Sequence, residues 1–226
     1  MTTILITGTN RGIGLELAKQ ALAKGWTVYG SARTVVTDAE AHICEHPGFH
    51  DLRFDVTDHE AVRAAAASIS DPIDILINNA GTIGPERQST LDMDFGGFAQ
   101  TFAINTLAPL AVSQAFLPHL RRSANPRILT ISSAMGSLSH AKSDRIAYRA
   151  SKAAVNKVMQ GLATDLAPMG VAVAVVHPGW VRTDMGGPDA DIDVGTSASG
   201  ILGLVDGLTL ARTGGFFNWD GSPAEW

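Results

Sequence analysis

The hydrophobic positions of the chain alternate between short β-branched runs and longer stretches with a helical period. Most of the short runs are apolar at both odd and even positions, as in strands buried on both faces of a parallel sheet. The predicted strands are Thr3–Thr7, Thr27–Ser31, Asp51–Phe54, Ile73–Asn78, Arg127–Ser132, Val171–Val176 and Gly215–Asn218. The stretches between them predict helices at Gly12–Lys24, His59–Ile69, Phe98–Arg121, Ala147–Leu166 and Thr196–Gly207.

This repetition of strand and helix predicts a doubly wound α/β fold with right-handed crossovers. We expect one domain over residues 1–226, with a seven-stranded parallel sheet and helices on both faces. Asp58 is placed to cap the helix that follows it, and Gly170 is placed to end one. The Gly-, Pro- and Asp-rich segment Met185–Gly195 is expected to be a surface loop.

One helical stripe leaves two interpretations open. Val155, Met159, Leu162 and Leu166 share a helix face. They belong either to the core or to a seam between two copies of the chain.

Composition narrows the classes of partner. The 226 residues include 45% hydrophobic and 17% charged residues, as in a compact globular domain. The net charge of −5 and the lack of a Lys/Arg run argue against nucleic acid or a membrane as partner. Cys44 is the single cysteine, and no signal peptide or 18-residue apolar run is present, so we expect a cytoplasmic protein. Pro47 and Gly48 interrupt the triplet His42, His46 and His50, so we expect no metal site there.

A glycine-rich segment follows the first strand and opens a helix. It reads Thr7-Gly8-Thr9-Asn10-Arg11-Gly12-Ile13-Gly14. A pyrophosphate needs close backbone approach, free N–H groups and a helix N-terminus. Gly8, Gly12 and Gly14 provide the first two, and the helix provides the third. The alternative is a plain tight turn.

The spacing TGxxxGxG resembles that of the short-chain dehydrogenase/reductase family, and the resemblance extends over essentially the whole chain. It implies a Rossmann fold that binds a nicotinamide dinucleotide. It also implies that the loop holds the cofactor through Gly8, Asn10, Arg11, Gly12, Ile13 and Gly14.

Two arginines indicate which dinucleotide is bound. An NAD site usually has an acidic residue at the end of the second strand, whereas Tyr29–Arg33 contains none. Arg33 and Arg11 can instead pair with a 2′-phosphate through charge and fork geometry. We therefore expect NADP(H) rather than NAD(H); the alternative is that both arginines face solvent. The resemblance adds Asp55 and Val56 at the adenine, and Asn79, Ala80 and Gly81 after the fourth strand, where Asn78 has a structural role.

A tyrosine and a lysine four residues apart form the predicted reacting centre. Tyr148 and Lys152 share one helix face, and a nearby ammonium lowers the pKa of a phenol toward the range useful for proton transfer. The segment Tyr148–Ala153 resembles the family's YxASK signature. The resemblance then assigns the substrate-binding hydroxyl to Ser133. It assigns the helix kink and a relay water to Asn105.

The turn after the sixth strand reads His177-Pro178-Gly179-Trp180-Val181-Arg182-Thr183. The resemblance implies that this turn contacts the nicotinamide, and the expected contacts are Pro178, Gly179, Val181 and Thr183. His177 is rejected as a base because Tyr148 already fills that role.

These motifs predict an NADP(H)-dependent oxidoreductase that interconverts a carbonyl and an alcohol. The C-terminal pattern FxxxDG and the segment YRASKAA resemble the family's C-factor-like branch, which includes small carbonyl reductases. The expected partners are a small-molecule carbonyl or alcohol substrate and further copies of the chain, as a homodimer or homotetramer. The alternative is a dinucleotide-binding signalling or regulatory protein of C-factor type, which acts through protein contacts.

Overall fold

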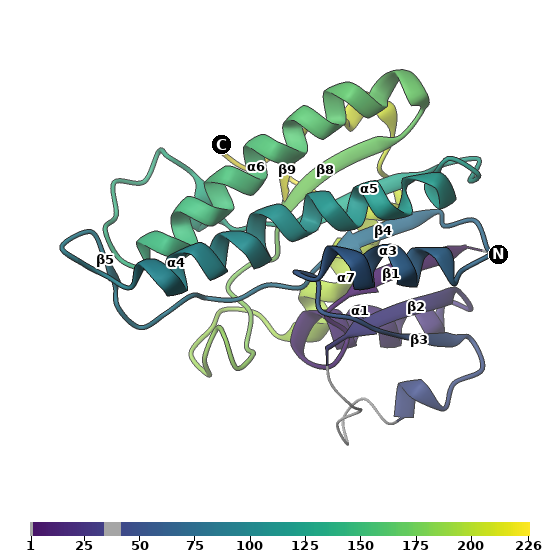
Figure 1. Ribbon diagram of the computed structural model, residues 1–226, viewed down its shortest axis with the longest axis horizontal. Helices are drawn as coiled ribbons and strands as arrows, with labels where there is room; N and C mark the ends of the chain where they lie inside the picture. Colours follow the sequence, from purple (N-terminus) through teal and green to yellow (C-terminus); the bar gives the residue numbers. More distant parts are fainter. Residues whose placement is uncertain (1, 34–41) are drawn as a thin grey trace.

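Seven parallel strands form the centre of the computed structural model, which describes residues 2–33 and 42–226 (Figure 1). The strands are β1 (Thr3–Thr7), β2 (Thr27–Ala32), β3 (Phe49–Arg53), β4 (Ile75–Asn78), β7 (Arg127–Ile131), β8 (Ala172–His177) and β9 (Phe216–Asn218). Their order is β3-β2-β1-β4-β7-β8-β9, and every pairing is parallel. This order reverses direction between β1 and β4, so the prediction of a doubly wound sheet is confirmed.

Helices cover both faces of the sheet. In Figure 1, α3 (His59–Ala67), α5 (Ala108–Leu120) and α6 (Ile146–Leu166) lie in front of the strands. The other face is covered by α1 (Gly12–Ala23) and α7 (Val194–Asp206). Side chains alternate along β1, so that Ile4 and Ile6 pack in one core and Leu5 packs in the other. Both cores consist mainly of Ile, Leu, Val and Ala side chains.

Two features between β4 and β7 differ from the prediction. The expected helix Phe98–Arg121 consists of α4 (Phe95–Phe102), a π-turn over Ala103–Leu107, and α5. A π-turn keeps the apolar pattern nearly continuous, so periodicity does not reveal it. The short hairpin of β5 (Gln88–Ser89) and β6 (Asp92–Met93) was not predicted, because two-residue strands carry no periodic signal.

Predicted caps and packing are present on the helices. The Asp58 side chain accepts hydrogen bonds from the backbone N–H groups of Glu60 and Ala61 at the start of α3. Gly170 has the expected left-handed conformation, with φ of 78°. The stripe on α6 is core, with Val155, Met159 and Leu166 buried and Leu162 packed against them. None of the helices in the described residues is long and apolar enough to span a membrane.

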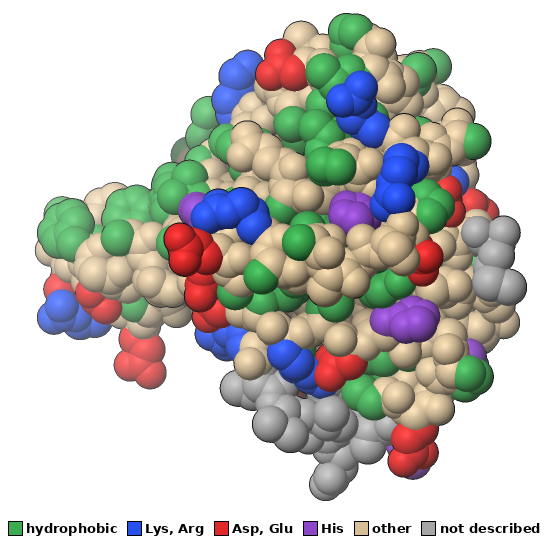
Figure 2. All heavy atoms as spheres, turned by 45° about the vertical axis from the view of Figure 1, so that its right-hand side comes forward, with side chains coloured by type: hydrophobic (Ala, Val, Ile, Leu, Met, Phe, Trp, Pro, Cys, Tyr) green, Lys and Arg blue, Asp and Glu red, His purple; other side chains and the backbone are tan. Residues whose placement is uncertain are grey.

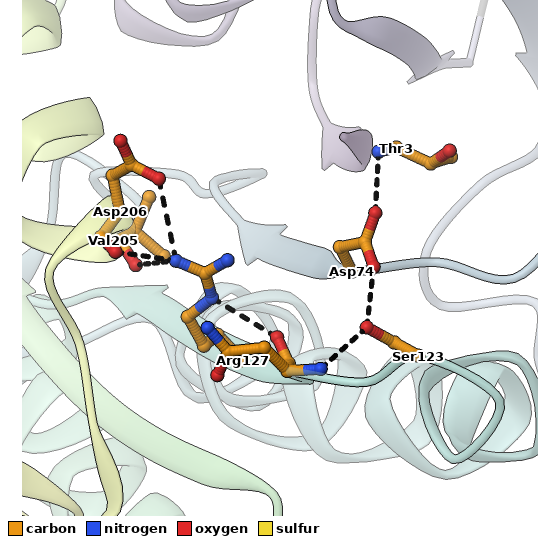
Figure 3. Close-up of polar contacts among 7 residues, drawn as sticks. Thr3, Asp74, Ser123, Arg127, Val205 and Asp206 are labelled. Atoms are coloured by element: carbon orange, nitrogen blue, oxygen red, sulfur yellow. Dashed lines mark hydrogen bonds and ion pairs between the residues drawn. The ribbon is translucent and has the colours of Figure 1, made fainter. Parts of the chain in front are cut away.

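Hydrogen bonds join several elements at the amino-terminal ends of the strands (Figure 3). Asp74, just before β4, accepts from the Thr3 backbone N–H at 2.8 Å and from the Ser123 hydroxyl. Arg127, the first residue of β7, is buried and donates from Nη1 to the carbonyl oxygens of Val205 and Asp206, at 3.0 and 2.6 Å. A cation therefore caps the C-terminus of α7, where the helix dipole is negative.

We expect the substitution Arg127→Met to destabilise the fold by about 2–3 kcal/mol, since the buried carbonyl oxygens of α7 lose a charged donor. For a chain of this size, the melting temperature falls by roughly 5–10 °C. Thermal unfolding followed by circular dichroism measures the change. Arg63→Met, at an exposed position on α3, is the matched control. An equal effect of both substitutions would contradict the role of the cap.

Candidate active site

A cleft lies at the carboxyl ends of the strands, across the point where the strand order reverses. Parallel sheets bind ligands at this place because adjacent crossovers leave a crevice there. Most of the predicted site residues line it: Gly8, Asn10, Arg11, Gly12, Ile13, Gly14, Arg33, Asp55, Val56, Asn79, Ala80, Gly81, Tyr148, Lys152, Pro178 and Thr183.

The glycine loop lies unusually close to β4. A Cβ atom on Gly14 would stand 2.1 Å from the Gly8 carbonyl oxygen and 2.4 Å from Nδ2 of Asn79. Asn79 donates from Nδ2 to the carbonyl oxygens of Thr7 and Gly8, at 2.9 and 3.1 Å. Gly8 and Gly12 have left-handed φ angles of 76° and 56°. Gly14 has no room for a Cβ atom, and the left-handed angles of Gly8 and Gly12 favour glycine. The N–H groups of Gly8 and Thr9 donate to the Ser31 carbonyl oxygen, and the rest of the loop with the start of α1 lines the cleft.

Each of the two predicted phosphate-binding arginines has an acidic neighbour. Nη1 of Arg11 lies 3.1 Å from Oδ2 of Asp184, and Nη1 of Arg33 lies 4.0 Å from Oδ2 of Asp55. Both pairs are solvent-exposed, and such pairs contribute little energy. Either arginine can therefore turn to an anion in the cleft without a large loss of stability.

Ser31, at the end of β2, was missed by the sequence analysis. It lines the cleft and is buried, and its hydroxyl has no hydrogen-bond partner in the described part of the chain. Buried hydroxyls normally have a partner, so this one indicates a ligand position beside Arg33.

Tyr148 lies in the first turn of α6 with its phenol beside the Ser133 hydroxyl. Both residues are buried. Burial raises the pKa of the Tyr148 phenol, while the hydrogen bond with Ser133 and the charge of Arg145 act in the opposite direction. Ser133 follows β7. Its hydroxyl is oriented by a local hydrogen bond, which it accepts from the backbone N–H of Met135 at 3.1 Å.

Lys152 extends from α6 to the carboxyl end of β7. Its Nζ donates to the Ile131 carbonyl oxygen at 2.8 Å and lies 5.7 Å from the centre of the Tyr148 ring. Burial lowers the pKa of Lys152 to about 8. The four-residue spacing predicts that Lys152 lowers the pKa of Tyr148, yet the net shift of the phenol's pKa is upward. Desolvation of the buried phenol outweighs the hydrogen bond with Ser133 and the charge of Arg145.

Asn105 lies inside the π-turn between α4 and α5. Its side chain accepts from the Thr82 N–H at 2.9 Å and donates to the Thr82 carbonyl oxygen at 2.8 Å and to Oγ of Ser151 at 3.0 Å. Asn105 thus joins the loop after β4 to the helix that carries Tyr148 and Lys152. A π-turn at such a position is common in functional sites.

The turn after β8 is only partly exposed to the cleft. Pro178 and Thr183 line it, whereas Gly179 and Val181 do not. Gly179 packs against Trp219 and Ile192, and Val181 is buried. Burial lowers the pKa of His177, rejected above as a base, and so favours its neutral imidazole.

The remaining lining residues were not predicted. Most are immediate neighbours of predicted ones, and their apolar or small side chains carry no motif that would have revealed them. Besides Ser31, they are Ala32, Phe54, Thr82, Ile104, Ile131, Ser132 and Met185.

We expect Lys152→Met to stabilise the fold at pH 7 by about 2–3 kcal/mol, although it removes a cleft residue. The pKa of Lys152 falls from 10.5 to about 8 on folding. The cost of burying its charge is therefore fully present below pH 8, declines as the pH rises through 8 to 10.5, and is absent above. Urea unfolding at several pH values measures this.

The free-energy difference between Lys152→Met and wild type should shrink across that window. Lys157→Met, at an exposed position one turn further along α6, serves as the control and should show no such dependence. A Lys152→Met protein less stable than wild type at pH 7 would refute this account of the buried ammonium.

Comparison with known proteins agrees with this geometry. A family model described as short chain dehydrogenase matches residues 2–191. The C-signal of Myxococcus xanthus is 43% identical over 167 residues, which cover 73% of this chain and 100% of that protein. A carbonyl reductase from chicken fatty liver, solved with NADPH bound, has a TM-score of 0.92 and 31% identity, with 100% of this chain and 99% of that one covered. The carbonyl reductase Sniffer of D. melanogaster has a TM-score of 0.93 and 32% identity, with both chains fully covered. The chain therefore belongs to the family of short-chain dehydrogenases and reductases.

Proposed function

We propose that this protein is an NADP(H)-dependent oxidoreductase that interconverts a carbonyl and an alcohol. The observation that carries the proposal is that the Tyr148 phenol, hydrogen-bonded to Ser133, lies near Lys152, and that Tyr148 and Lys152 both line the cleft. A proton donor, a second hydroxyl and a cation at one place suit a reaction that turns a carbonyl oxygen into a hydroxyl. The similarity to two carbonyl reductases supports the same reaction class.

The cleft fits a nicotinamide dinucleotide that carries a 2′-phosphate. The glycine loop leaves room and donors for a pyrophosphate, and Ser31, whose hydroxyl has no hydrogen-bond partner among the described residues, lines the same cleft as Arg33. The chicken reductase was solved with NADPH. The residues that we propose to hold the cofactor are those predicted from the sequence, including Gly179 and Val181, together with Ser31.

Each side chain has one role in the proposed reaction. Bound NADPH supplies the hydride that adds to the carbonyl carbon. The Ser133 hydroxyl donates to the carbonyl oxygen and holds it beside Tyr148. The Tyr148 phenol gives its proton to that oxygen as the alcohol forms, and its raised pKa keeps this proton in place at neutral pH.

The phenolate that remains is stabilised by Lys152. Its positive charge favours the phenolate, and its lowered pKa lets it pass on a proton near neutral pH. We propose that Asn105 holds a water that connects Lys152 to solvent, since the Asn105 side chain and the Lys152 Nζ both lie close to Gly81, which lines the cleft.

The wider setting is part of the proposal. We propose that residues 1–226 act as one domain in the cytoplasm, on a small-molecule substrate, and that the chain forms a homodimer or homotetramer as the family resemblance implies. The alternative function is a dinucleotide-binding signalling protein. The 43% identity to a protein named C-signal supports this alternative function.

We expect wild type to oxidise NADPH with aldehydes, ketones or quinones, and Tyr148→Phe to lower kcat by about 1,000-fold, because the proton donor is lost. Absorbance of the reduced nicotinamide, measured over a panel of carbonyls, gives both rates. Leu162→Met, a partly buried position further along α6, controls for changes to that helix. Tight NADPH binding without turnover of any carbonyl would instead favour the signalling protein.

We expect Arg33→Ala to weaken NADPH binding by roughly 10- to 100-fold, the range of one lost charged hydrogen bond, and to leave NADH binding unchanged. Fluorescence titration with both nucleotides measures the two affinities. Arg63→Ala is the control. If the substitution weakened both nucleotides equally, Arg33 would not read the 2′-phosphate.

A further inference from the structure

The hairpin of β5 and β6 projects from the body of the protein beside the start of α4 (Figure 1). Apolar side chains gather at the end of this projection in Figure 2. Leu91 in the hairpin turn is 97% exposed, and Phe95 at the start of α4 is 77% exposed. Gln88 is the exception, because its polar side chain is only 6% exposed. A buried amide in an otherwise exposed hairpin calls for a physical reason.

All the polar atoms of the Gln88 side chain have partners. Its Nε2 donates to the carbonyl oxygens of Ile83 and Pro85, at 3.1 and 2.7 Å. Its Oε1 accepts from the backbone N–H of Tyr148 at 3.1 Å. The two donated bonds fix the orientation of the amide, so the acceptor can only face α6.

The first turn of α6 lacks a cap of its own. Helices are usually capped by a Ser, Thr, Asp or Asn side chain in extended backbone. Here the capping position is Arg145, which has left-handed angles of φ 52° and ψ 47° and makes no side-chain cap bond. The Tyr148 N–H is the third of the helix and has no acceptor within it. Gln88, sixty residues earlier, supplies that acceptor.

The next residue of the same turn, Arg149, is held separately. Arg149 donates from Nε to the Asp144 carbonyl oxygen and pairs through Nη2 with the Asp144 carboxylate, both at 2.8 Å. These bonds restrain the segment before the helix, and they leave the Tyr148 N–H to Gln88.

We propose that Gln88 is a positioning residue for the reaction, which caps α6 at Tyr148 and so keeps the phenol in contact with Ser133. The inference rests on the proposed function for its kinetic consequence. Its structural content, the control of the Tyr148 ring by Gln88, can be tested without turnover.

The test uses Gln88→Met, which keeps the length of the side chain and removes its hydrogen bonds. Gln114→Met, at an exposed position on α5, is the matched control. The chain has only two tyrosines, so protein labelled with ¹³C at tyrosine Cζ gives two NMR signals. Tyr148→Phe assigns them. Gln88→Asn, too short to reach α6, replaces Gln88→Met if the latter does not fold.

We expect Gln88→Met to move the Tyr148 signal and to leave the Tyr29 signal in place. If the wild type is active, Gln88→Met lowers kcat by up to roughly 100-fold and leaves the affinity for NADPH unchanged, because a small displacement of a reacting group has this cost. The basic limb of the pH–rate profile moves to higher pH, because the phenol loses the Ser133 bond while Lys152 and Arg145 stay. In a double-mutant cycle, the shifts of this basic limb caused by Gln88→Met and by Ser133→Ala are not additive.

The outcomes separate the two proposals. An unmoved Tyr148 signal, or an unchanged pH profile and kcat in Gln88→Met, overturns the role of Gln88 and leaves the proposed function standing. A wild type that reduces no carbonyl overturns the proposed function, while a shifted Tyr148 signal still supports the contact with Gln88.

Discussion

The close approach of the glycine loop to β4 is the constraint on which the cleft depends. Gly14 has no space for a Cβ atom, because the Gly8 carbonyl oxygen and the Asn79 amide occupy it. Asn79 binds the carbonyl oxygens of Thr7 and Gly8, so β1, the loop and β4 are held as one unit. The start of α1 therefore points at the crevice between β1 and β4, and the remaining site residues are arranged around that crevice.

Buried charges at the two ends of the strands have opposite effects on stability. At the amino-terminal ends of the strands, Arg127 is buried but donates to two carbonyl oxygens at the end of α7 and to the Asn125 carbonyl oxygen, so its charge stabilises the fold. At the carboxyl ends of the strands, Lys152 is buried, its only hydrogen bond within the described residues goes to the Ile131 carbonyl oxygen, and its pKa is about 8. A charge held with so little compensation lowers stability, and the chemistry proposed here makes use of it.

Tyr148 shows which properties of a site a sequence motif predicts and which depend on the fold. The four-residue spacing correctly predicted that Tyr148 and Lys152 share a helix face, since that follows from helix geometry alone. The direction of the pKa shift did not follow. It depends on burial by segments far apart in the sequence, and on the Ser133 hydroxyl, which acts against that burial. The cap from Gln88 is of the same kind, because no local pattern links residues 88 and 148.

The sequence by itself determined the doubly wound parallel fold and the glycine loop after the first strand, because strand periodicity, glycine spacing and the handedness of crossovers are local rules. It also determined most of the residues that line the cleft. Only the tertiary structure decided which acids lie beside Arg11 and Arg33, that the Ser31 hydroxyl lacks a partner within residues 2–33 and 42–226, and that the hairpin holds the start of α6. These features depend on side chains that meet across long chain separations, where desolvation and available partners are set by packing rather than by neighbouring residues.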